Sequence, residues 1–157
     1  MPEQATAESD DLAEWARPDP GSSISPEQWA NNLRMSPQLN MTCTSLGADG
    51  ATFVVSAPPL ADNPNGSVHG GMLAAIADHA MSILAAWVKP AGTIAFTGAL
   101  NVQYHRPAIA PLALRAYVIM SGRRASFIEL EIRADDGRRC ASAQATMIVN
   151  GRVGVGR

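Results

Sequence analysis

The chain has 157 residues, with 46% hydrophobic and 17% charged side chains, which suits one globular domain that needs no stabilising metals or disulfides. The net charge is only −2, so the dense basic stripe of a nucleic acid-binding protein is excluded. Residues 1–60 hold eight acids and two bases, whereas residues 101–157 hold four acids and nine arginines. This basic C-terminal part is typical either of a site for a phosphate-bearing small ligand or of a solvated strand surface.

The N-terminal residues and the two cysteines favour a cytoplasmic location. The sequence begins with acidic residues and has no basic stretch before an apolar run, so no signal peptide is expected. Cys43 and Cys140 lack metal-ligand spacing, and we expect both to be free thiols in a reducing cytoplasm. Neither a metal nor a separate cofactor is predicted.

The first part of the chain predicts an arm, a helix and a hairpin. Residues 1–24 are rich in Ala, Glu, Asp, Pro, Gly and Ser, which favours a loosely held arm. A helix to about Arg34 begins at Ser25, because Ser25, Pro26 and Gln28 have the capping-box spacing with Pro at the first helical position. Two strands follow, joined by a glycine-bearing turn, at residues 39–46 and 51–57.

The second part predicts one long helix and four further strands. Residues 70–88 form a helix that is too short and too polar at its centre to span a membrane. Strand character recurs in segments separated by Pro- or Gly-bearing turns, at residues 93–106, 112–121, 125–134 and 138–149. Short connections make these strands antiparallel. The sequence therefore predicts an α+β fold, with a single domain over residues 25–150 and a tail at residues 151–157.

Asp78 is the most informative residue of the long helix. With His79 and Ser82 it is one of only three strongly polar side chains there, so the helix is expected to be buried. Burial of an ionised carboxylate without a partner is costly, and no Lys or Arg lies one helical turn away. Two explanations stay open: a structural aspartate hydrogen-bonded to loop amides or a distant Arg, and a functional acid.

Three segments around this helix together resemble a known family. They are NPNGSVHGGML at residues 63–73, Asp78 within the helix, and NVQYHRP at residues 101–107. Over about residues 39–150 they are similar to the hotdog-fold acyl-CoA thioesterases of the phenylacetate-pathway type. The resemblance implies a hotdog fold, with a curved antiparallel sheet around the central helix, and hydrolysis of an acyl-CoA to carboxylic acid and CoA. It also implies a homodimer with sheets joined edge to edge, commonly doubled to a homotetramer.

The resemblance also implies roles for individual residues. Asp78 matches the catalytic carboxylate, and Gly70 matches the residue whose backbone amide forms the oxyanion hole. Asn63 matches a polar side chain beside the reacting carbonyl. Thr97 matches a hydroxyl residue that helps to place the attacking water.

These residue types suit thioester hydrolysis. Fixed donors stabilise the oxyanion of the transition state, and the amides of Gly70 and Gly71 stand unpaired at a helix start. A glycine pair that merely eases entry into the helix is the alternative. The carboxylate of Asp78 either attacks the carbonyl directly or draws a proton from water, and both routes are open.

The spacing of the two catalytic groups predicts a dimer. Asp78 lies eight residues after Gly70, which is roughly 12 Å along a helix axis and too far for both to touch one carbonyl carbon. If both act on the same substrate, the carboxylate comes from a neighbouring subunit. Paired sites across a dimer interface are therefore expected.

Histidines and arginines supply further candidates. His69 is a possible base, but its place at the helix start favours a hydrogen bond that fixes the loop. His79 is expected to pack elsewhere, about 100° around the helix from Asp78. Guanidinium groups suit the phosphates of coenzyme A, and the candidates for that contact are Arg106, Arg123 and Arg124. Gly71 is expected to lie beside the substrate.

Two other functions stay open. A hotdog hydratase or dehydratase needs a catalytic His beside an acid, and Asp62-Asn63-Pro64 only faintly echoes that pattern, because no His follows Pro64 closely. A non-catalytic hotdog protein that binds an acyl thioester or serves as an assembly subunit is the second. The acyl group also stays open among aromatic, hydroxylated aromatic and medium-chain fatty acyl groups.

Overall fold

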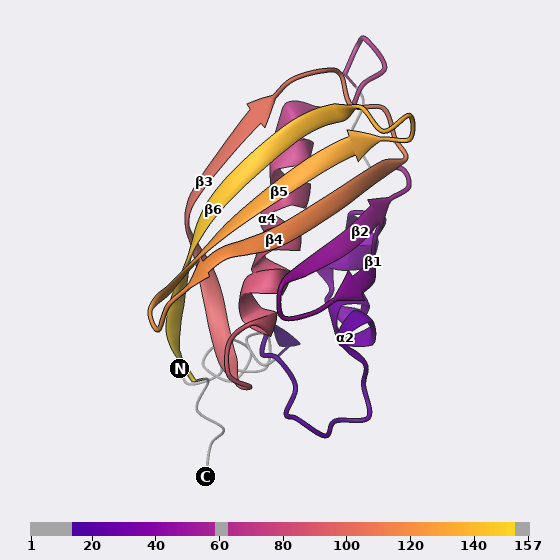
Figure 1. Ribbon diagram of the computed structural model, residues 1–157. Coiled ribbons are helices and arrows are strands. Elements are labelled where there is room, and N and C mark those ends of the chain that lie inside the picture. Colours follow the sequence, from indigo (N-terminus) through magenta and orange to yellow (C-terminus); the bar gives the residue numbers. More distant parts are fainter. Residues whose placement is uncertain (1–13, 59–62, 153–157) are drawn as a thin grey trace, which may run out of the picture.

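The structure, a computed structural model, describes residues 14–58 and 63–152. Within these residues it has three helices, namely α2 (Pro26–Asn32), α3 (Met35–Gln38) and α4 (Gly70–Trp87). The strands are β1 (Met41–Leu46), β2 (Gly50–Val55), β3 (Thr93–Tyr104), β4 (Leu112–Ser121), β5 (Ala125–Ala134) and β6 (Arg139–Arg152). They form one antiparallel sheet that curves around α4 (Figure 1), which confirms the predicted α+β architecture.

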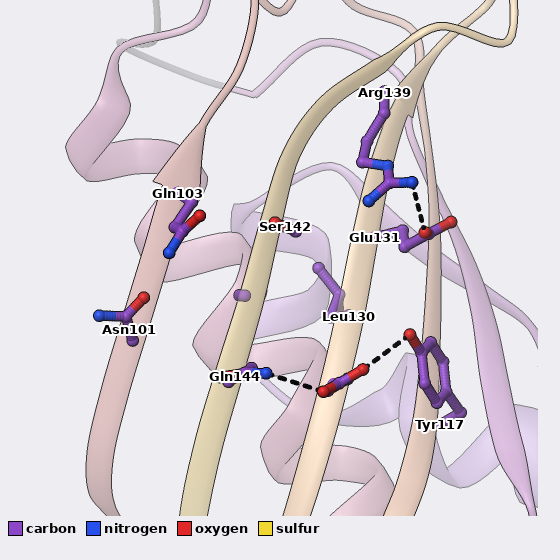
Figure 2. Close-up of a pocket in the computed structure, with 10 residues that line it drawn as sticks. Asn101, Gln103, Tyr117, Leu130, Glu131, Arg139, Ser142 and Gln144 are labelled. Carbon is purple, nitrogen blue, oxygen red and sulfur yellow. Dashed lines mark hydrogen bonds and ion pairs between the residues drawn. The ribbon is translucent and has the colours of Figure 1, made fainter.

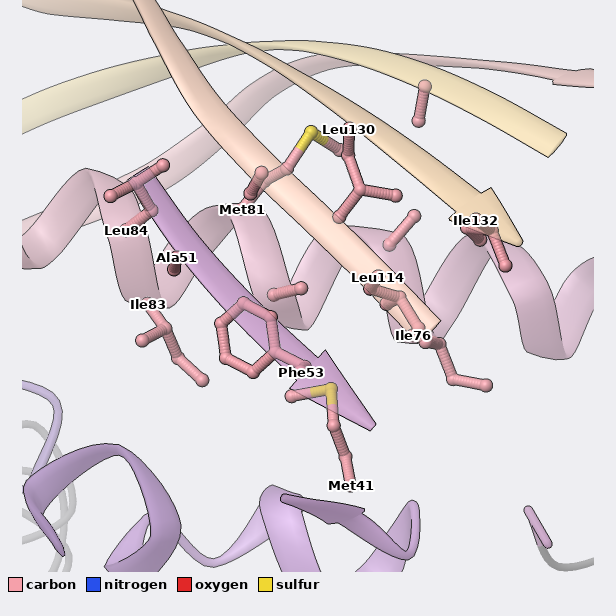
Figure 3. Packing of buried hydrophobic residues seen from close by; sticks show 14 of the residues in the cluster. Met41, Ala51, Phe53, Ile76, Met81, Ile83, Leu84, Leu114, Leu130 and Ile132 are labelled. Carbon is pink, nitrogen blue, oxygen red and sulfur yellow. The ribbon is translucent and has the colours of Figure 1, made fainter. Parts of the chain in front are cut away.

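Helix α4 is the centre of the core. Ten of its residues are buried, and the apolar ones among them belong to the core that the helix forms with the concave face of the sheet (Figure 3). Each fully buried Ile or Leu contributes about 1.5–3 kcal/mol relative to exposure. By length and composition the helix would suffice to cross a membrane, but 56% of it is buried inside the molecule. It is therefore the core helix that the sequence predicts.

The alternating pattern of β5 shows how the sheet encloses this helix. Ile128, Leu130 and Ile132 are buried against α4, while Glu129 and Glu131 lie on the opposite face. The bounds predicted for β4 and β5 are confirmed to the residue.

Several bounds differ from prediction by one to three residues, and two of these differences have a clear structural cause. The first helix ends at Asn32 rather than near Arg34, because Leu33 turns to an extended conformation that buries its side chain, and the short helix α3 follows. Strand β6 continues to Arg152 rather than ending near residue 149, because Arg152 pairs with Thr93 at the start of β3. Long-range pairing, which local periodicity does not report, decides where β6 ends.

The order of strands in the sheet is β1-β2-β4-β5-β6-β3. Strand β3 therefore lies at one edge, paired only with β6, although it follows α4 in the chain. Its other edge, 12 residues long, is unpaired among the residues that the structure describes. An edge of this length presents unpaired backbone donors and acceptors to any strand that can join it.

Residues before the predicted domain contact the end of α4. The Arg17 guanidinium donates to the carbonyl oxygens of Trp87 (2.8 Å) and Lys89 (2.9 Å) and lies 4.5 Å above the Trp87 ring. Because the last carbonyls of a helix lack intrahelical partners, Arg17 caps α4. The predicted arm, residues 1–24, is thus in contact with the core at this point, while residues 1–13 lie outside the described residues.

His79 is buried on the side of α4 away from Asp78, as expected. The Ser36 hydroxyl donates to the Ala30 carbonyl (2.7 Å), so it accepts a hydrogen bond from the Nε2–H of His79 at 2.9 Å. The Trp15 ring packs edge-on against the imidazole at 5.4 Å. Burial lowers the pKa of His79 from 6.5 to about 4, because the charged ring would lose its hydration.

We expect the stability of the protein to fall between pH 6.5 and pH 4 because of His79. The imidazole stays neutral in the folded state, whereas the unfolded chain takes up a proton below pH 6.5, so acid favours unfolding. The shift corresponds to a loss on the order of 3 kcal/mol in the free energy of unfolding. Urea unfolding at pH 7 and pH 4.5 measures it. His79→Gln keeps a donor to Ser36 without titrating, and an undiminished pH dependence in that variant would contradict the assignment.

Candidate active site

Asp78 and Thr97 form the first of two groups of candidate site residues. The Thr97 hydroxyl, on β3, donates a hydrogen bond of 2.6 Å to Oδ1 of Asp78, on α4. Within residues 14–58 and 63–152, no Lys, Arg or His side chain forms an ion pair with Asp78. The carboxylate is thus held by one hydroxyl and remains available for chemistry.

A β-bulge aims Thr97 at the helix. Gly98 is the extra residue between Thr97, opposite Met147, and Ala99, opposite Thr146. A Cβ on Gly98 would lie 2.6 Å from the Ile148 side chain, so any other residue would force that side chain to move. The bulge keeps Thr97 on the α4 face of the sheet.

The predicted full burial of Asp78 is wrong for the single chain. Asp78 is half-buried and Thr97 is exposed. The reason is the position of β3: the sheet ends at this strand, so the side of α4 next to its open edge lacks cover from its own chain. That side of the helix carries mainly small residues, which leave space beside the carboxylate, namely Gly71, Ala74, Ala75 and Ser82.

The second group lies at the N-terminus of α4. A cavity of about 360 Å³ is lined there by Asn63, Gly70 and Arg106, three of the residues predicted from the sequence. His69 is the N-cap of the helix, and its Nδ1 accepts a hydrogen bond of 3.0 Å from the Gly71 N–H. The Gly70 N–H finds no acceptor among the described residues, so it is the donor left for a ligand.

The loop that carries Asn63 is held by its own hydrogen bonds. The Asn63 N–H donates to the Ser67 carbonyl (2.7 Å), and Asn65 Oδ1 accepts from the Ser67 N–H (3.1 Å) and hydroxyl (2.7 Å). The Val68 N–H donates to the Ala108 carbonyl at 2.7 Å, which ties the loop to the segment after β3. The Asn63 side-chain amide donates to the Ser67 hydroxyl at 3.4 Å, and Asn63 lines the same cavity as Gly70. Asp62, of the motif that echoes a hydratase, lies outside the described residues.

The predicted site residues thus fall into two groups within one chain. Asp78 and Thr97 lie two helical turns from Gly70 and Asn63, in agreement with the separation expected from helix geometry. Arg106 lies with the Gly70 group. Arg123 and Arg124 follow Gly122 in the β4–β5 connection, where the Arg124 carbonyl accepts from Val149, at the opposite end of the sheet (Figure 1).

Comparison with known proteins supports the fold described above. Residues 65–141 match the family model of the Thioesterase superfamily. A thioesterase of Haemophilus influenzae superposes with a TM-score of 0.74 at 20% identity, covering 83% of this chain and 93% of that one. The PaaI protein of the E. coli phenylacetic acid degradation operon gives 0.71 at 22% identity, covering 83% and 98%. A hypothetical thioesterase of Streptococcus pneumoniae, crystallised with coenzyme A, gives 0.67 at 19% identity, covering 75% and 91%.

The protein has the hotdog fold. The identities of these structures are low, so the likeness concerns the fold. No curated protein matches the chain in sequence.

Tyr104 is a residue of the hotdog domain's site that the sequence analysis quoted only as part of a motif. Its hydroxyl donates to the Gly70 carbonyl at 2.7 Å, and its ring lies 3.3–3.5 Å from where a Cβ on Gly70 would stand. The signal was its place two residues before Arg106, on the strand that follows the helix. Only the packing of β3 against the start of α4 shows that the ring covers Gly70.

A polar hollow on the outer face of the sheet contains none of the predicted site residues. It measures about 220 Å³ and lies over β3, β6, β5 and β4 (Figure 2). The Tyr117 hydroxyl donates to Glu129 at 2.9 Å, and the Gln144 amide donates to the same carboxylate at 2.7 Å. The hydrogen bond to Glu129 raises the pKa of Tyr117. These groups satisfy one another, so the hollow offers no evident nucleophile or base.

We expect Gly70→Ala to show the contact with Tyr104 in a double-mutant cycle. Alanine in a helix is favoured over glycine by up to about 1 kcal/mol, but its Cβ meets the Tyr104 ring at 3.3 Å. Gly70→Ala should therefore stabilise the Tyr104→Ala protein and fail to stabilise the wild type, with a coupling of about 1 kcal/mol. Urea unfolding of the four proteins measures the coupling. In Tyr104→Phe the ring remains, so its response should match the wild type; additive effects would refute the contact.

Proposed function

We propose that the protein hydrolyses an acyl-CoA thioester to the free carboxylic acid and coenzyme A, at two equivalent sites that two chains share. The observation that carries this proposal is the separation of the site residues: a half-exposed Asp78–Thr97 pair beside an open strand edge, and a Gly70 amide in a cavity two helical turns away. The match to the Thioesterase superfamily supports a thioester hydrolase. The structural neighbour crystallised with coenzyme A supports an acyl-CoA as substrate.

The Gly70 N–H supplies the oxyanion stabilisation in this proposal. It is the first amide of an 18-residue helix, so the positive end of the helix dipole adds to the hydrogen bond. Asn63 lines the same cavity, and its amide is placed to contact the reacting carbonyl. His69 acts by holding the Gly71 amide, which leaves the Gly70 amide as the donor that faces the substrate.

Asp78 supplies the attack. Either the carboxylate adds to the thioester carbonyl and the resulting anhydride is hydrolysed, or it takes a proton from water that adds to the carbonyl. Since the Thr97 hydroxyl donates its hydrogen bond to Asp78, the lone pairs of Thr97 Oγ1 are left to accept a hydrogen bond from that water. Coenzyme A leaves as a thiolate, whose ordinary pKa of about 8.5 makes an obligatory acid unnecessary.

The open edge of β3 is where we place the second chain. If two β3 strands pair antiparallel with Asn101 opposite Asn101 of the other chain, Ala99 faces Gln103 of that chain. The extra residue of the bulge at Gly98 then sets Thr97 of each chain opposite Tyr104 of the other. Because Tyr104 lies on Gly70 and Thr97 on Asp78, this register brings the two groups together across the interface. Arg123 and Arg124, remote from the Gly70 cavity in one chain, would reach the same substrate only from the partner.

Further assembly and location extend the proposal. Exposed apolar side chains on the outer part of the sheet suit pairing of dimers into a homotetramer, namely Phe96, Ile119, Met120, Phe127 and Ile148. Cys43 and Cys140 are free and buried, which suits a reducing cytoplasm. We also propose that the enzyme is of the phenylacetate-pathway type, on the strength of the motif resemblance and of the PaaI neighbour's fold, while the acyl group stays open.

Asp78→Asn is expected to lower kcat for hydrolysis of acyl-CoA by about 10²- to 10⁴-fold, because the amide neither attacks nor accepts the proton. The measurement is thiol release from a panel of acyl-CoAs with aromatic, hydroxylated aromatic and medium-chain acyl groups. Unchanged turnover in Asp78→Asn would remove the proposed catalyst. Tight acyl-CoA binding without turnover in the wild type would favour a binding protein, and addition of water to an enoyl-CoA would favour a hydratase.

Two inactive variants should restore each other if the site is shared. Gly70→Pro deletes the N–H at a helical position that tolerates proline, so we expect a loss of about 10²–10³-fold in kcat, while Gly70→Ala keeps the N–H and serves as control. When Asp78→Asn and Gly70→Pro chains are refolded together, each heterodimer regains one intact site. About a quarter of the wild-type activity should return.

The same mixture tests the alternative of a site within one chain. There, mixing restores nothing, and a monomeric protein with full activity would also overturn the shared site. The mass in solution, measured by light scattering on the same samples, distinguishes monomer, dimer and tetramer.

A further inference from the structure

A second open cavity adjoins the Gly70 cavity. It measures about 650 Å³ and is lined by Tyr104, His105, Arg106, Arg133 and Arg139. The first three of these residues also line the Gly70 cavity, so the two hollows adjoin at the same end of the sheet. We call the second hollow the arginine cavity. Of its arginines, only Arg106 belongs to a motif that the sequence reveals, because Arg133 and Arg139 lie on other strands.

Positive charge exceeds negative charge around the arginine cavity. Arg133 and Arg139 share one carboxylate, Glu131, at 2.9 Å and 3.4 Å. Arg106 has a carbonyl partner, that of Arg139, at 3.3 Å. The neighbouring Asp136 is paired with Arg138 at 2.6 Å. The hydrogen bond from the Arg138 N–H lowers the pKa of the Asp136 carboxyl, and the charge of Arg106 also helps to lower it. His105 contributes a hydrogen bond to the Ser142 hydroxyl at 2.8 Å. The lining of the cavity thus holds three guanidinium groups, while the Glu131 and Asp136 carboxylates lie next to it.

The arginine side chains are held but still accessible. Arg133 Nη1 donates to the Gly137 carbonyl at 2.9 Å, and its Nε and Nη2 contact Glu131, while 43% of the side chain stays exposed. The Arg139 side chain is 47% exposed, and Figure 2 shows it directed toward Glu131 along β6. Guanidinium groups fixed in this way lose little entropy when they bind an anion, and their planar donors match phosphate oxygens.

We propose that the arginine cavity binds the phosphate groups of the coenzyme A nucleotide while the thioester lies in the Gly70 cavity. The assignment rests on the proposed function for the identity of the ligand. Coenzyme A carries its phosphates at the far end of a pantetheine arm, and the surface shared by the two hollows offers that arm a path. The Tyr104 ring, 53% exposed between the hollows, provides an apolar wall for it.

Binding of coenzyme A itself tests the assignment without turnover. Titration calorimetry compares coenzyme A, 3′-dephospho-coenzyme A and pantetheine on the wild type and on Arg133→Gln/Arg139→Gln. We expect the double variant to raise Kd for coenzyme A by about tenfold or more, since charged hydrogen bonds are lost, and to leave Kd for pantetheine unchanged. The matched control is Arg115→Gln, which removes an exposed arginine of the same sheet that lines neither cavity.

The salt dependence gives a second readout. The affinity of the wild type for coenzyme A should fall as ionic strength rises, and this slope should flatten in the double variant and persist in Arg115→Gln. Thermal unfolding of the three proteins verifies that each is folded.

Failure of this assignment and failure of the hydrolase proposal give different results. An unchanged Kd for coenzyme A in the double variant, with hydrolysis by the wild type intact, overturns the arginine cavity alone. The arginine cavity is also overturned if the double variant binds coenzyme A as the wild type does but binds succinyl-pantetheine more weakly. In that case the arginines would bind a carboxylate of the acyl group. Selective loss of coenzyme A binding supports the arginine cavity even if the wild type hydrolyses no thioester.

Discussion

The structure depends on the need to cover a helix that is apolar on nearly every side. Helix α4 has no broad polar face to expose to water, so the remainder of the domain must enclose it. A single antiparallel sheet does this by curving, and its concave face meets α4 with alternating apolar side chains (Figures 1 and 3). The Arg17 guanidinium closes the C-terminal end, and the His69 side chain closes the N-terminal end. Core, caps and strand register all follow from that requirement.

An open sheet leaves one part of the cover incomplete. The sheet ends at β3, and the side of α4 next to that edge is where Asp78 lies. In the isolated chain a carboxylate there avoids the full desolvation cost of burial, because it is only half-buried and still contacts water. If a second chain joins the edge, water is displaced and the carboxylate becomes more reactive toward an acyl carbon. In such a dimer, completion of the core and completion of the site would occur together.

The two ends of the proposed substrate pose different physical problems. At the reacting end, the donor is a backbone amide whose position is fixed by the helix, and the Tyr104 hydroxyl and ring hold the adjacent Gly70 carbonyl. At the nucleotide end, the requirement is excess positive charge that stays accessible, which Arg106, Arg133 and Arg139 meet. The oxyanion of the acyl group needs a donor in a fixed position, which rigid main chain supplies. Phosphate groups need charged donors with less precise placement, which solvated arginine side chains supply.

Local sequence pattern determined the elements and the spacing along α4. Capping residues and two- and 3.6-residue periodicities fixed most element bounds to within a few residues, because such preferences depend on neighbours in the chain. The separation of Gly70 from Asp78 needed no more than the rise of a helix. Only the tertiary structure decided that β3 lies at the edge, that Asp78 is half-exposed, and that Arg133 and Arg139 meet Arg106. These features depend on which strands pair, and strand pairing is set by contacts between residues distant in sequence, which no local period records.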